Sequence, residues 1–413
     1  MSFMRIYTPA ALVCLAALVL TCVALDVPWC AASAASLDIE VTLEPEHTGV
    51  PIPISVKLPC QDEFSPTAWH VEERPSGRAV PCQIETDAEI LRFMVESAVS
   101  SRPVKKHFRF APGRAAHADT VSIEHTDAKQ LAVLDEGRPV LVYNYRSVLP
   151  EGVPEDRRRS CYIHPIYGPG GEILTDDFPP DHFHHRGLSW MWPQVKAGDR
   201  QYDLWTIKGV RQRFVKLRSC TGGQVYGVLQ VANGWYTDEG RNILDETVTI
   251  TTFRSSMSGR IVDIELVLRP VGEPVTIGSS GSGYGGLNFR FAPRTDTMLC
   301  TSGGALDKDV NRERFLWSDL SGRFDNSPGF SGVAIFDHPE NPSHPTGWSN
   351  RFYGILGPSF TGIEPVTIQP EKPLQVRYRL WIHEGDAESG AVARAYEAYM
   401  HPPKVEVLDA EGD

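Results

Sequence analysis

The stretch Thr247-Val-Thr-Ile-Thr-Thr-Phe253, followed by Ile261-Val-Asp-Ile-Glu-Leu-Val-Leu268, decides the fold class of this chain. Both segments are rich in β-branched residues and place apolar side chains at every second position, which is the period of a strand. The polar residues 255–259 between them suit a turn. An antiparallel sheet with one face on a core and one toward solvent produces this alternation. The two segments therefore predict a hairpin within a large antiparallel sheet.

Strand patterns of the same kind occur on both sides of this hairpin. Leu37-Asp-Ile-Glu-Val-Thr-Leu43 and Val376-Arg-Tyr-Arg-Leu-Trp-Ile382 alternate in the same way. Gln130-Leu-Ala-Val-Leu134 and Pro139-Val-Leu-Val-Tyr143 flank a polar turn, which predicts a second hairpin. Residues 145–160 are polar and rich in Arg and Pro, so we expect a surface loop there.

One helix is predicted, close to the end of the chain. Val392, Tyr396 and Tyr399 recur at helical spacing, and Asp386 precedes them as the expected N-cap. The proline pair at 402–403 ends the pattern. The whole pattern predicts an all-β fold with one C-terminal helix.

We expect two β-domains along the chain. A small N-terminal β-sandwich would span residues 36–130, and a large antiparallel β-sandwich would span residues 131–402. Residues 403–413 are expected to form a C-terminal tail.

The composition is that of a globular protein, with 41% hydrophobic and 22% charged residues over 413 positions. There are 40 Lys and Arg against 52 Asp and Glu, giving a formal net charge of −12. A negative surface repels phosphate backbones, so we expect no nucleic-acid partner.

The first 34 residues have the layout of a secretory signal peptide. A short positive segment precedes the apolar residues 10–25, and Ala32-Ser-Ala34 is a small-residue cleavage site. An uncleaved membrane anchor is the alternative, although sixteen residues are marginal for crossing a bilayer. No later segment approaches the roughly 20 apolar residues of a spanning helix. We expect a secreted or periplasmic protein with no membrane insertion after signal cleavage.

Five cysteines remain beyond the signal peptide, which is too few for a disulfide scaffold. Cys60 with Cys82 is the most local candidate for a disulfide in an exported protein. The alternative is that each cysteine is a small buried hydrophobic residue.

The densest chemical signal follows the second predicted hairpin, where four of the thirteen histidines occur within 22 residues. In an extended backbone, His182, His184 and Arg186 project to one side, while Asp181 and His185 project to the other. Two imidazoles and a guanidinium in one space favour an anionic ligand. An imidazole there can also move protons near neutral pH.

A second polar cluster, residues 337–345 with Trp348, follows an apolar strand at 332–336. The two clusters together supply the expected catalytic residues, which are Asp181, His182, His184, His185, Arg186 and His338. Flat aromatic rings suit sugar faces, so they are included among the expected substrate-binding residues, His164, Tyr167, Trp190, Trp192, Asp337 and Trp348. The alternatives are ordinary core packing for the aromatics and a Pro-rich turn for 337–345.

The cofactor is left open by the sequence. Imidazole and carboxylate groups can bind zinc, iron or copper, so a divalent metal is one possibility. The candidate metal ligands are His164, His182 and His184. No H-E-x-x-H or related spacing fixes such a site.

Three blocks resemble an exported bacterial family labelled "methane oxygenase PmoA". Asp181-His-Phe-His-His-Arg-Gly-Leu188 resembles its D-H-P-H-H-R-G-L signature, with Phe183 in place of the usual proline. Gly285-Gly-Leu-Asn-Phe-Arg290 and Asp337-His-Pro-Glu-Asn-Pro342 resemble its later blocks. The resemblance covers roughly residues 130 to 400 and implies an exported β protein, found alongside carbohydrate-degrading systems. The strand pattern is also similar to mutarotase-like supersandwiches, which is a resemblance of fold only.

Three functions are compatible with these patterns. The first is an exported carbohydrate-active lyase, epimerase or hydrolase that uses the histidines for acid/base chemistry on a glycan or small-molecule substrate. The second is a noncatalytic glycan-binding or scaffold module in which the aromatic residues bind. The third is a metal-dependent oxidoreductase or lyase, as the family label implies. The sequence does not decide whether the protein is an enzyme.

Overall fold

The computed structural model describes residues 36–58, 69–85, 88–113, 120–126, 130–327 and 329–408. Residues Ser36–Asp413 form one compact unit, and the predicted signal peptide lies outside the described residues. No helix in the described part of the chain is long and apolar enough to span a bilayer.

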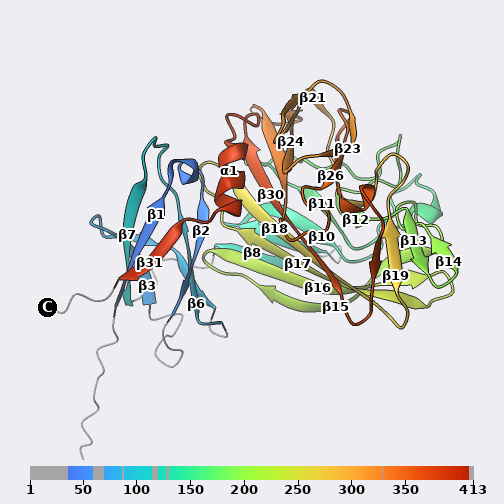
Figure 1. The fold of residues 1–413 in the computed structure, drawn as a ribbon, viewed down its shortest axis with the longest axis horizontal. Helices are drawn as coiled ribbons and strands as arrows, with labels where there is room; N and C mark the ends of the chain where they lie inside the picture. The colour runs from blue at the N-terminus through green and yellow to red at the C-terminus, as the bar shows by residue number, and fades with distance from the viewer. Residues whose placement is uncertain are drawn as a thin grey trace, which may run out of the picture. The chain divides into compact units, whose positions relative to one another are not determined.

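The largest sheet has nine antiparallel strands, and its long central members lie side by side in Figure 1. In spatial order they are β15 (Val210–Thr221), β16 (Tyr226–Thr237), β17 (Asn242–Phe253), β18 (Arg260–Pro270), β30 (Leu374–Glu384), β25 (Ser331–Asp337), β24 (Trp317–Phe324), β21 (Arg294–Thr301) and β22 (Gly304–Leu306). The hairpin predicted from 247–268 is β17 paired with β18, so this prediction is confirmed.

A seven-stranded sheet packs against the nine-stranded sheet. Its strands are β27 (Ile355–Leu356), β20 (Gly286–Arg290), β12 (Leu188–Met191), β11 (Tyr162–Ile166), β10 (Arg138–Asn144), β9 (Leu131–Asp135) and β8 (Val121–His125). The hairpin predicted at 130–143 is β9 paired with β10. One buried cluster joins side chains such as Val248 and Leu266 of the larger sheet to Leu188 and Phe289 of the smaller. The two sheets therefore form an antiparallel β-sandwich.

Two short sheets complete this part of the chain. The four-stranded sheet consists of β14 (Arg200–Tyr202), β13 (Gln194–Ala197), β19 (Val275–Gly278) and β29 (Val366–Ile368). The three-stranded sheet consists of β23 (Val310–Arg314), β26 (Gly347–Asn350) and β28 (Pro358–Ser359). Short 3-10 turns are η1 (Pro45–His47), η3 (Glu155–Arg157) and η4 (Phe360–Gly362).

The N-terminal residues, together with the late strand β31 (Lys404–Leu408), form a five-stranded and a three-stranded sheet. The first contains β31, β1 (Leu37–Leu43), β7 (Val104–Pro112), β3 (Trp69–Arg74) and β4 (Arg78–Val80). The second contains β2 (Ile52–Lys57), β6 (Ile90–Val95) and β5 (Cys82–Glu85). Phe93 and Phe108 join the two sheets through rings whose centroids lie 5.0 Å apart. The strand expected from the alternation at 37–43 is β1 of the first of these sheets.

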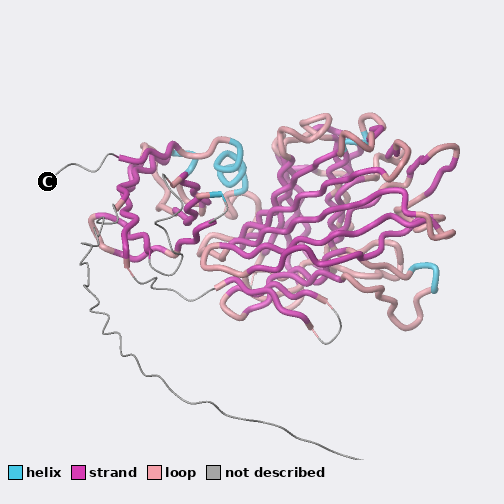
Figure 2. The backbone as a smooth tube through the Cα atoms, turned by 90° about the horizontal axis from the view of Figure 1, so that it is seen from below, coloured by secondary structure: helices cyan, strands magenta, loops and turns pink. Residues whose placement is uncertain are grey.

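Strands dominate the described chain, and α1 (Val392–Met400) is its α-helix (Figure 2). The prediction of an all-β fold with one C-terminal helix is confirmed. The expected N-cap is wrong, because Ala391 occupies that position and makes no side-chain capping bond. Asp386 instead accepts hydrogen bonds from the backbone nitrogen and hydroxyl of Ser389, at 2.9 and 2.6 Å. These bonds close a turn before the helix begins.

Two segments differ from the expected domain limits. Val121–His125, within the range expected for the first domain, forms β8 of the seven-stranded sheet. The expected tail contains β31, which pairs with β1 over five residue pairs. The edge of β1 would otherwise present unpaired backbone groups, which explains why a late segment returns to it.

The expected disulfide between Cys60 and Cys82 includes a residue outside the described part of the chain. Cys82 is a free, buried thiol, and burial raises its pKa to about 11. Cys60 lies outside the described residues. Cys82 is thus the small buried hydrophobic residue of the alternative interpretation.

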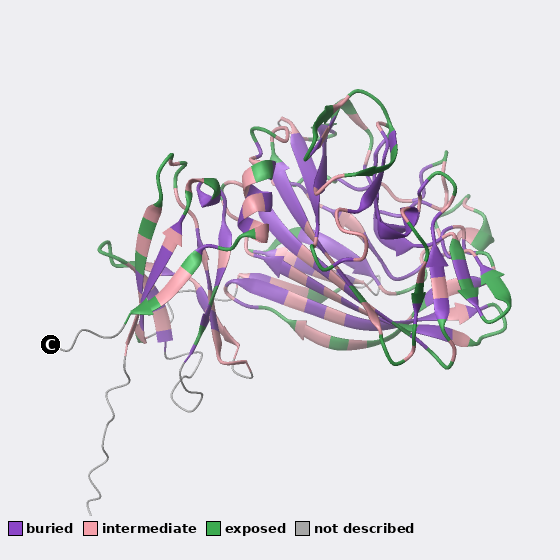
Figure 3. Cartoon of the chain, viewed as in Figure 1, coloured by how far each residue is buried: buried purple, intermediate pink, exposed green. Residues whose placement is uncertain are grey.

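Buried residues line the strands of both large sheets (Figure 3), and the side chains of one strand alternate between the core and the opposite face. In β12 and β20, Leu188, Trp190, Leu287 and Phe289 belong to the core cluster. Their neighbours therefore point to the outer face of the seven-stranded sheet. The candidate site lies on that face.

Removal of residues 404–413 is expected to lower the free energy of unfolding by about 1–5 kcal/mol, because five cross-strand pairs are lost. Urea denaturation of the full chain and of the truncated chain measures the difference. Truncation after Leu408 is the matched control, because it keeps β31. Equal stability of the two truncated chains would show that β31 does not stabilise the sheet.

Candidate functional site

The histidine segment is a folded loop between β11 and β12, not an extended strand. The backbone nitrogen of His182 donates to the Pro179 carbonyl at 2.9 Å, and that of His185 donates to the His182 carbonyl at 2.8 Å. An isolated bridge between Asp177 and Arg186 closes the loop. The predicted alternation is therefore wrong, because these turns bring all three histidines to the same place.

Arg186 fixes the conformation of this loop from inside. Its side chain is fully buried, and its guanidinium carbon lies 3.2 Å from the ring centroid of Phe178. The guanidinium donates to the carbonyls of Phe183, His185 and Arg157, the last two at 2.6 Å. The expectation that Arg186 faces a ligand beside His182 is wrong, because the side chain is buried and both of its Nη atoms donate to backbone carbonyls.

The three clustered imidazoles contact one another directly. The ring of His182 lies parallel to that of His185, with centroids 4.6 Å apart and 4° between the planes. His184 is edge-on to both, at 5.6 Å from His182 and 4.5 Å from His185. His185 is 2% exposed, whereas the side chain of His182 is 39% exposed. His182 is therefore more accessible to solvent or a ligand than the buried His185.

Aromatic side chains from distant segments surround the histidines. Trp205 lies against His184 and His185, at centroid distances of 6.4 and 6.0 Å. Tyr353 lies parallel to His182 at 5.7 Å and is 42% exposed. Tyr284 connects the two, with its ring 5.3 Å from Trp205 and its hydroxyl 3.4 Å from that of Tyr353. The site is an open aromatic surface with a histidine edge.

Charged groups flank this surface. Oδ2 of Asp181 lies 2.8 Å from Nδ1 of His182, and Oδ1 lies 3.3 Å from the guanidinium of Arg290. The guanidinium carbon of Arg290 also lies 5.0 Å from the centroid of Tyr353. Arg351 donates to the hydroxyl of Tyr284 at 2.8 Å. Nη1 of Arg290 is buried and has no hydrogen-bond partner among the described residues.

Burial shifts the pKa values of the ionisable groups at this surface in different directions. Desolvation, reinforced by neighbouring histidines and arginines, lowers the pKa of His184 to about 4 and that of His185 to about 2. Burial opposes the shift at Asp181, yet the close contact with His182 and the charge of Arg290 lower the pKa of that carboxyl. Burial raises the pKa of Asp177 to about 7, against the charge of Arg186. At neutral pH the buried histidines are therefore uncharged hydrogen-bonding groups.

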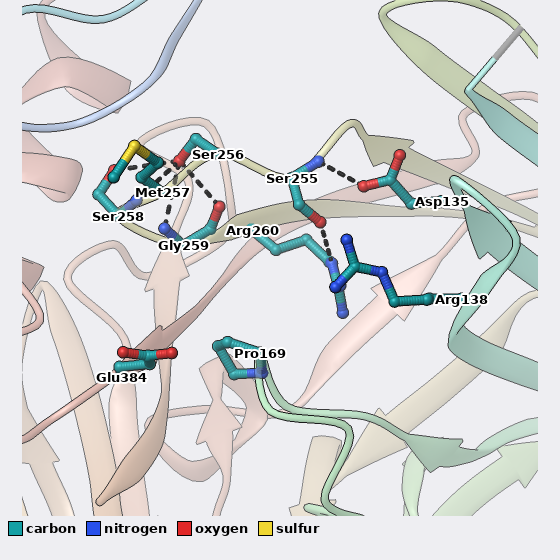
Figure 4. A pocket seen from close by; sticks show the side chains of 10 residues that line it. All are labelled: Asp135, Arg138, Pro169, Ser255, Ser256, Met257, Ser258, Gly259, Arg260 and Glu384. Atoms are coloured by element: carbon teal, nitrogen blue, oxygen red, sulfur yellow. Dashed lines mark hydrogen bonds between the residues drawn. The ribbon is translucent and has the colours of Figure 1, made fainter. Parts of the chain in front are cut away.

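His164 and Tyr167, both expected to bind substrate, contact other parts of the fold. Nδ1 of His164 lies 2.9 Å from the hydroxyl of Thr175, and burial lowers its pKa to about 4. The carbonyl of Tyr167 accepts a bond from Arg260 at 3.2 Å. Arg260 lines a separate hollow of about 160 Å³ beside the turn 255–259, shown in Figure 4.

The expected sugar-binding tryptophans are core residues. Trp190, Trp192 and Trp348 are each 0% exposed, and Trp190 and Trp192 belong to the buried cluster between the large sheets. The Trp348 indole donates to the Phe315 carbonyl at 2.8 Å. A ligand has no free ring face to stack on at these positions, so the core-packing alternative describes them.

The second polar cluster is a self-contained turn at the end of β25. The buried carboxylate of Asp337 accepts bonds from Asn341 at 2.8 Å and from the backbone nitrogen of Thr346 at 3.1 Å, and it lies 2.8 Å from His344. The ring of His338 lies against that of Tyr399, 5.8 Å away. These contacts agree with the alternative interpretation of 337–345 as a Pro-rich turn. Asp337 and His338 contact residues other than the clustered histidines.

A metal centre has no support from the donor geometry. Within the described ranges, no group of three or more His, Cys, Asp or Glu side chains is arranged to hold a metal ion. His164 is bonded to Thr175, and His182 is paired with Asp181, so the three candidate ligands do not converge.

Sequence reasoning missed the partners that come from distant segments. Tyr284, Arg290, Arg351 and Tyr353 were not among the expected site residues. One signal was present, because Leu287 and Phe289 alternate with Asn288 and Arg290 in β20. Period-two alternation with an apolar core face puts Arg290 on the opposite face, although it does not show which loop covers that face.

The fold and the site together define a mostly β protein with a histidine and tyrosine surface on the outer face of an antiparallel sandwich. The chain belongs to the family of unknown function (DUF6807), which it matches over residues 130–397. All residues of the candidate site lie within that range. The finer resemblance to the family labelled methane oxygenase PmoA stays a prediction.

Solved structures with distant similarity include an alpha-mannosidase from Enterococcus faecalis V583, with 10% identity and a TM-score of 0.41. A glycosyl hydrolase family 38 protein from Enterococcus faecalis has 9% identity and a TM-score of 0.40. Each alignment covers 91% of this chain and 47% of the other, so the chain spans about half the length of the solved structures it matches. No curated protein matches the sequence.

Arg186→Lys is expected to lower the free energy of unfolding by about 3 kcal/mol, because a compact ammonium lacks the spread, planar donors that bind three carbonyls and pack on Phe178. Urea denaturation at neutral pH measures this loss. The exposed Arg200, which pairs with Glu239 at 3.0 Å, provides the control Arg200→Lys. Equal stability of the two variants would contradict the role of Arg186.

His185 is expected to make stability dependent on pH. Its pKa is about 2 in the fold against an ordinary value of 6.5, so the fold favours the neutral ring. This contribution is fully present above pH 6.5 and is lost as the pH falls toward 2. It amounts to about 2 kcal/mol between pH 7 and pH 5.

His185→Asn should therefore lose less unfolding free energy than the wild type between these two pH values. Urea denaturation at pH 7 and pH 5 tests this difference. His401→Asn is the control, because the side chain of His401 is 72% exposed. An unchanged pH dependence in His185→Asn would contradict the burial argument.

Proposed function

We propose that this protein is an exported carbohydrate-active enzyme in which His182, oriented by Asp181, transfers protons at an open aromatic surface. The single observation that carries the proposal is the Asp181–His182 pair, with its 2.8 Å contact, beside Tyr353. A carboxylate this close to Nδ1 favours the tautomer with a proton on Nδ1, which leaves Nε2 as the proton acceptor in the proposed reaction. Export is inferred from the signal-like residues 1–34.

The surroundings of His182 favour a sugar as substrate. Tyr353 and Tyr284 present flat rings with hydroxyl edges, which suit the apolar face and the hydroxyl groups of a pyranose. His184 and His185 remain neutral, so they offer hydrogen bonds without adding charge. The ring of Trp205 supports both of them from behind.

Arg290 favours an oxidised sugar, a keto-sugar or a uronate. Its free Nη1 lies in the same cluster as Asp181 and Tyr353, where it can stabilise negative charge on an oxygen. Removal of the proton next to a carbonyl places the electron pair on that oxygen, as an enolate. Return of the proton to either face gives epimerisation, and departure of a neighbouring group gives elimination. The proposed reaction class is therefore that of an epimerase or lyase.

The test measures exchange of the carbon-bound proton next to the carbonyl in D₂O, by NMR, over a panel of keto-sugars and uronates. His182→Gln should slow exchange by about 10²–10⁴-fold, because it removes the proton acceptor. Asp181→Asn should slow it as well, since an amide cannot hold the same tautomer. His401→Gln is the matched control at an exposed position. Exchange in His182→Gln at the wild-type rate would overturn the proposal.

A noncatalytic glycan-binding module is the second candidate, and the 42% exposure of Tyr353 favours it. Binding to a glycan array that survives His182→Gln but is lost in Tyr353→Ala, with no exchange activity in the wild type, would select this function. Aromatic stacking alone would then account for the surface.

A further inference from the structure

A second hollow, of about 240 Å³, lies at the edge strand β15, and its lining includes none of the three clustered histidines. Four arginines line it: Arg158 and Arg159 from the loop after β10, and Arg211 and Arg213 from β15. No Asp or Glu is among the described residues that line it. The proposed acid/base site uses none of these arginines.

The deepest of these cations is Arg159, which is 4% exposed. Its guanidinium donates to the carbonyl of Leu204 at 3.2 Å and to Oε1 of Gln212 at 3.1 Å. Its Nε is buried and has no hydrogen-bond partner among the described residues. Arg159, one of the residues that line the hollow, therefore retains an unused donor.

The acidic groups near these arginines are engaged elsewhere or exposed. Glu246, buried behind Gln212, accepts bonds from Gln212, Asn233 and Trp235 at 2.8–2.9 Å. Arg158 pairs with Glu155, whose side chain is 74% exposed. Glu155 and Glu246 thus offset part of the local charge without filling the hollow.

The two arginines of β15 remain available for a ligand. Arg211 makes one contact with Asp238, at 3.1 Å, and its Nε is buried without a partner among the described residues. The exposed Arg213 has its guanidinium 5.2 Å from the ring centroid of Tyr236. Each therefore has N–H donors that an anion can accept.

We propose that this hollow binds a small organic oxyanion, whose carboxylate, phosphate or sulfate group is held by Arg159, Arg211 and Arg213. The apolar side chains of Leu204 and Ile207 line the hollow beside these charges, so they can pack against the carbon skeleton of the ligand. Guanidinium groups bind such oxyanions through paired N–H donors. This inference does not depend on the proposed proton transfer, because it concerns binding at a different set of residues.

The test is isothermal titration calorimetry of the full chain at low ionic strength, where electrostatic binding is strongest. The probes are glucuronate, inorganic phosphate and inorganic sulfate, with glucose as the uncharged match for glucuronate. The anions should bind and glucose should not. The anion with the lowest Kd identifies the preferred oxyanion group. Tighter binding of glucuronate than of the two inorganic anions would show that the carbon skeleton contributes.

Variants locate the binding to the hollow. Arg211→Gln with Arg213→Gln should raise the Kd at least tenfold. Arg200→Gln, at an exposed arginine of β14 that does not line the hollow, should leave the Kd unchanged. Arg159 is avoided, because its bonds to Leu204 and Gln212 support the fold. Arg213→Gln alone should still weaken anion binding. Because Arg213 is exposed, this single variant provides the test if the double variant is unstable.

Three results would overturn the proposal. They are absence of anion binding in the wild type, equal binding of glucose and glucuronate, and unchanged affinity in Arg213→Gln. Retained anion binding in His182→Gln separates this site from the proposed acid/base site. A failure of proton exchange would then leave the anion site intact.

Discussion

The buried guanidinium of Arg186 is the constraint on which the site depends. Its hydrogen bonds go to backbone carbonyls, one of them from the separate segment at Arg157. A buried charge without partners costs several kcal/mol, so loop conformations that remove these carbonyls from Arg186 are strongly disfavoured. The bonds to Phe183 and His185 lie within the same turn as the three histidines. Arg186 thus sets the positions of the imidazoles without reaching the surface itself.

Fixing the loop in this way gives adjacent imidazoles different environments. His185 is directed inward and loses its ability to carry charge near neutral pH, whereas His182 remains partly exposed beside Asp181. Such a division would serve the proton transfer that we propose for His182. Three charged imidazoles at ring distances of 4.5–5.6 Å would repel one another, and the neutral rings of His184 and His185 avoid this repulsion. The difference between His182 and His185 therefore comes from burial, since the two residues are chemically identical.

The sequence was informative about the sheets and about the loop that bears the histidines, because both depend on local pattern. The hairpins at 130–143 and 247–268 follow from alternation and turn residues alone. Side-chain direction within 181–186 was not predictable, since it depends on the carbonyls that Arg186 binds. The burial of Trp190 and Trp192 was also hidden, because a core aromatic and an exposed one have the same sequence signature. Tyr353 lies beside His182 because the fold brings two distant segments together. No local sequence pattern indicates this contact.

The charge distribution has a consequence for ligands of either site. The chain has a formal net charge of −12, so its average surface repels anions. Interactions between exposed charges are screened beyond about 8–10 Å at physiological salt, which makes the nearest groups decisive. Arg290 and Arg351 lie at the histidine surface, and four further arginines line the hollow at β15. These arginines place guanidinium donors at both sites of an acidic protein. An anion that binds here is therefore selected by short-range geometry rather than by long-range attraction, which favours ligands that fit the hydrogen-bond donors closely.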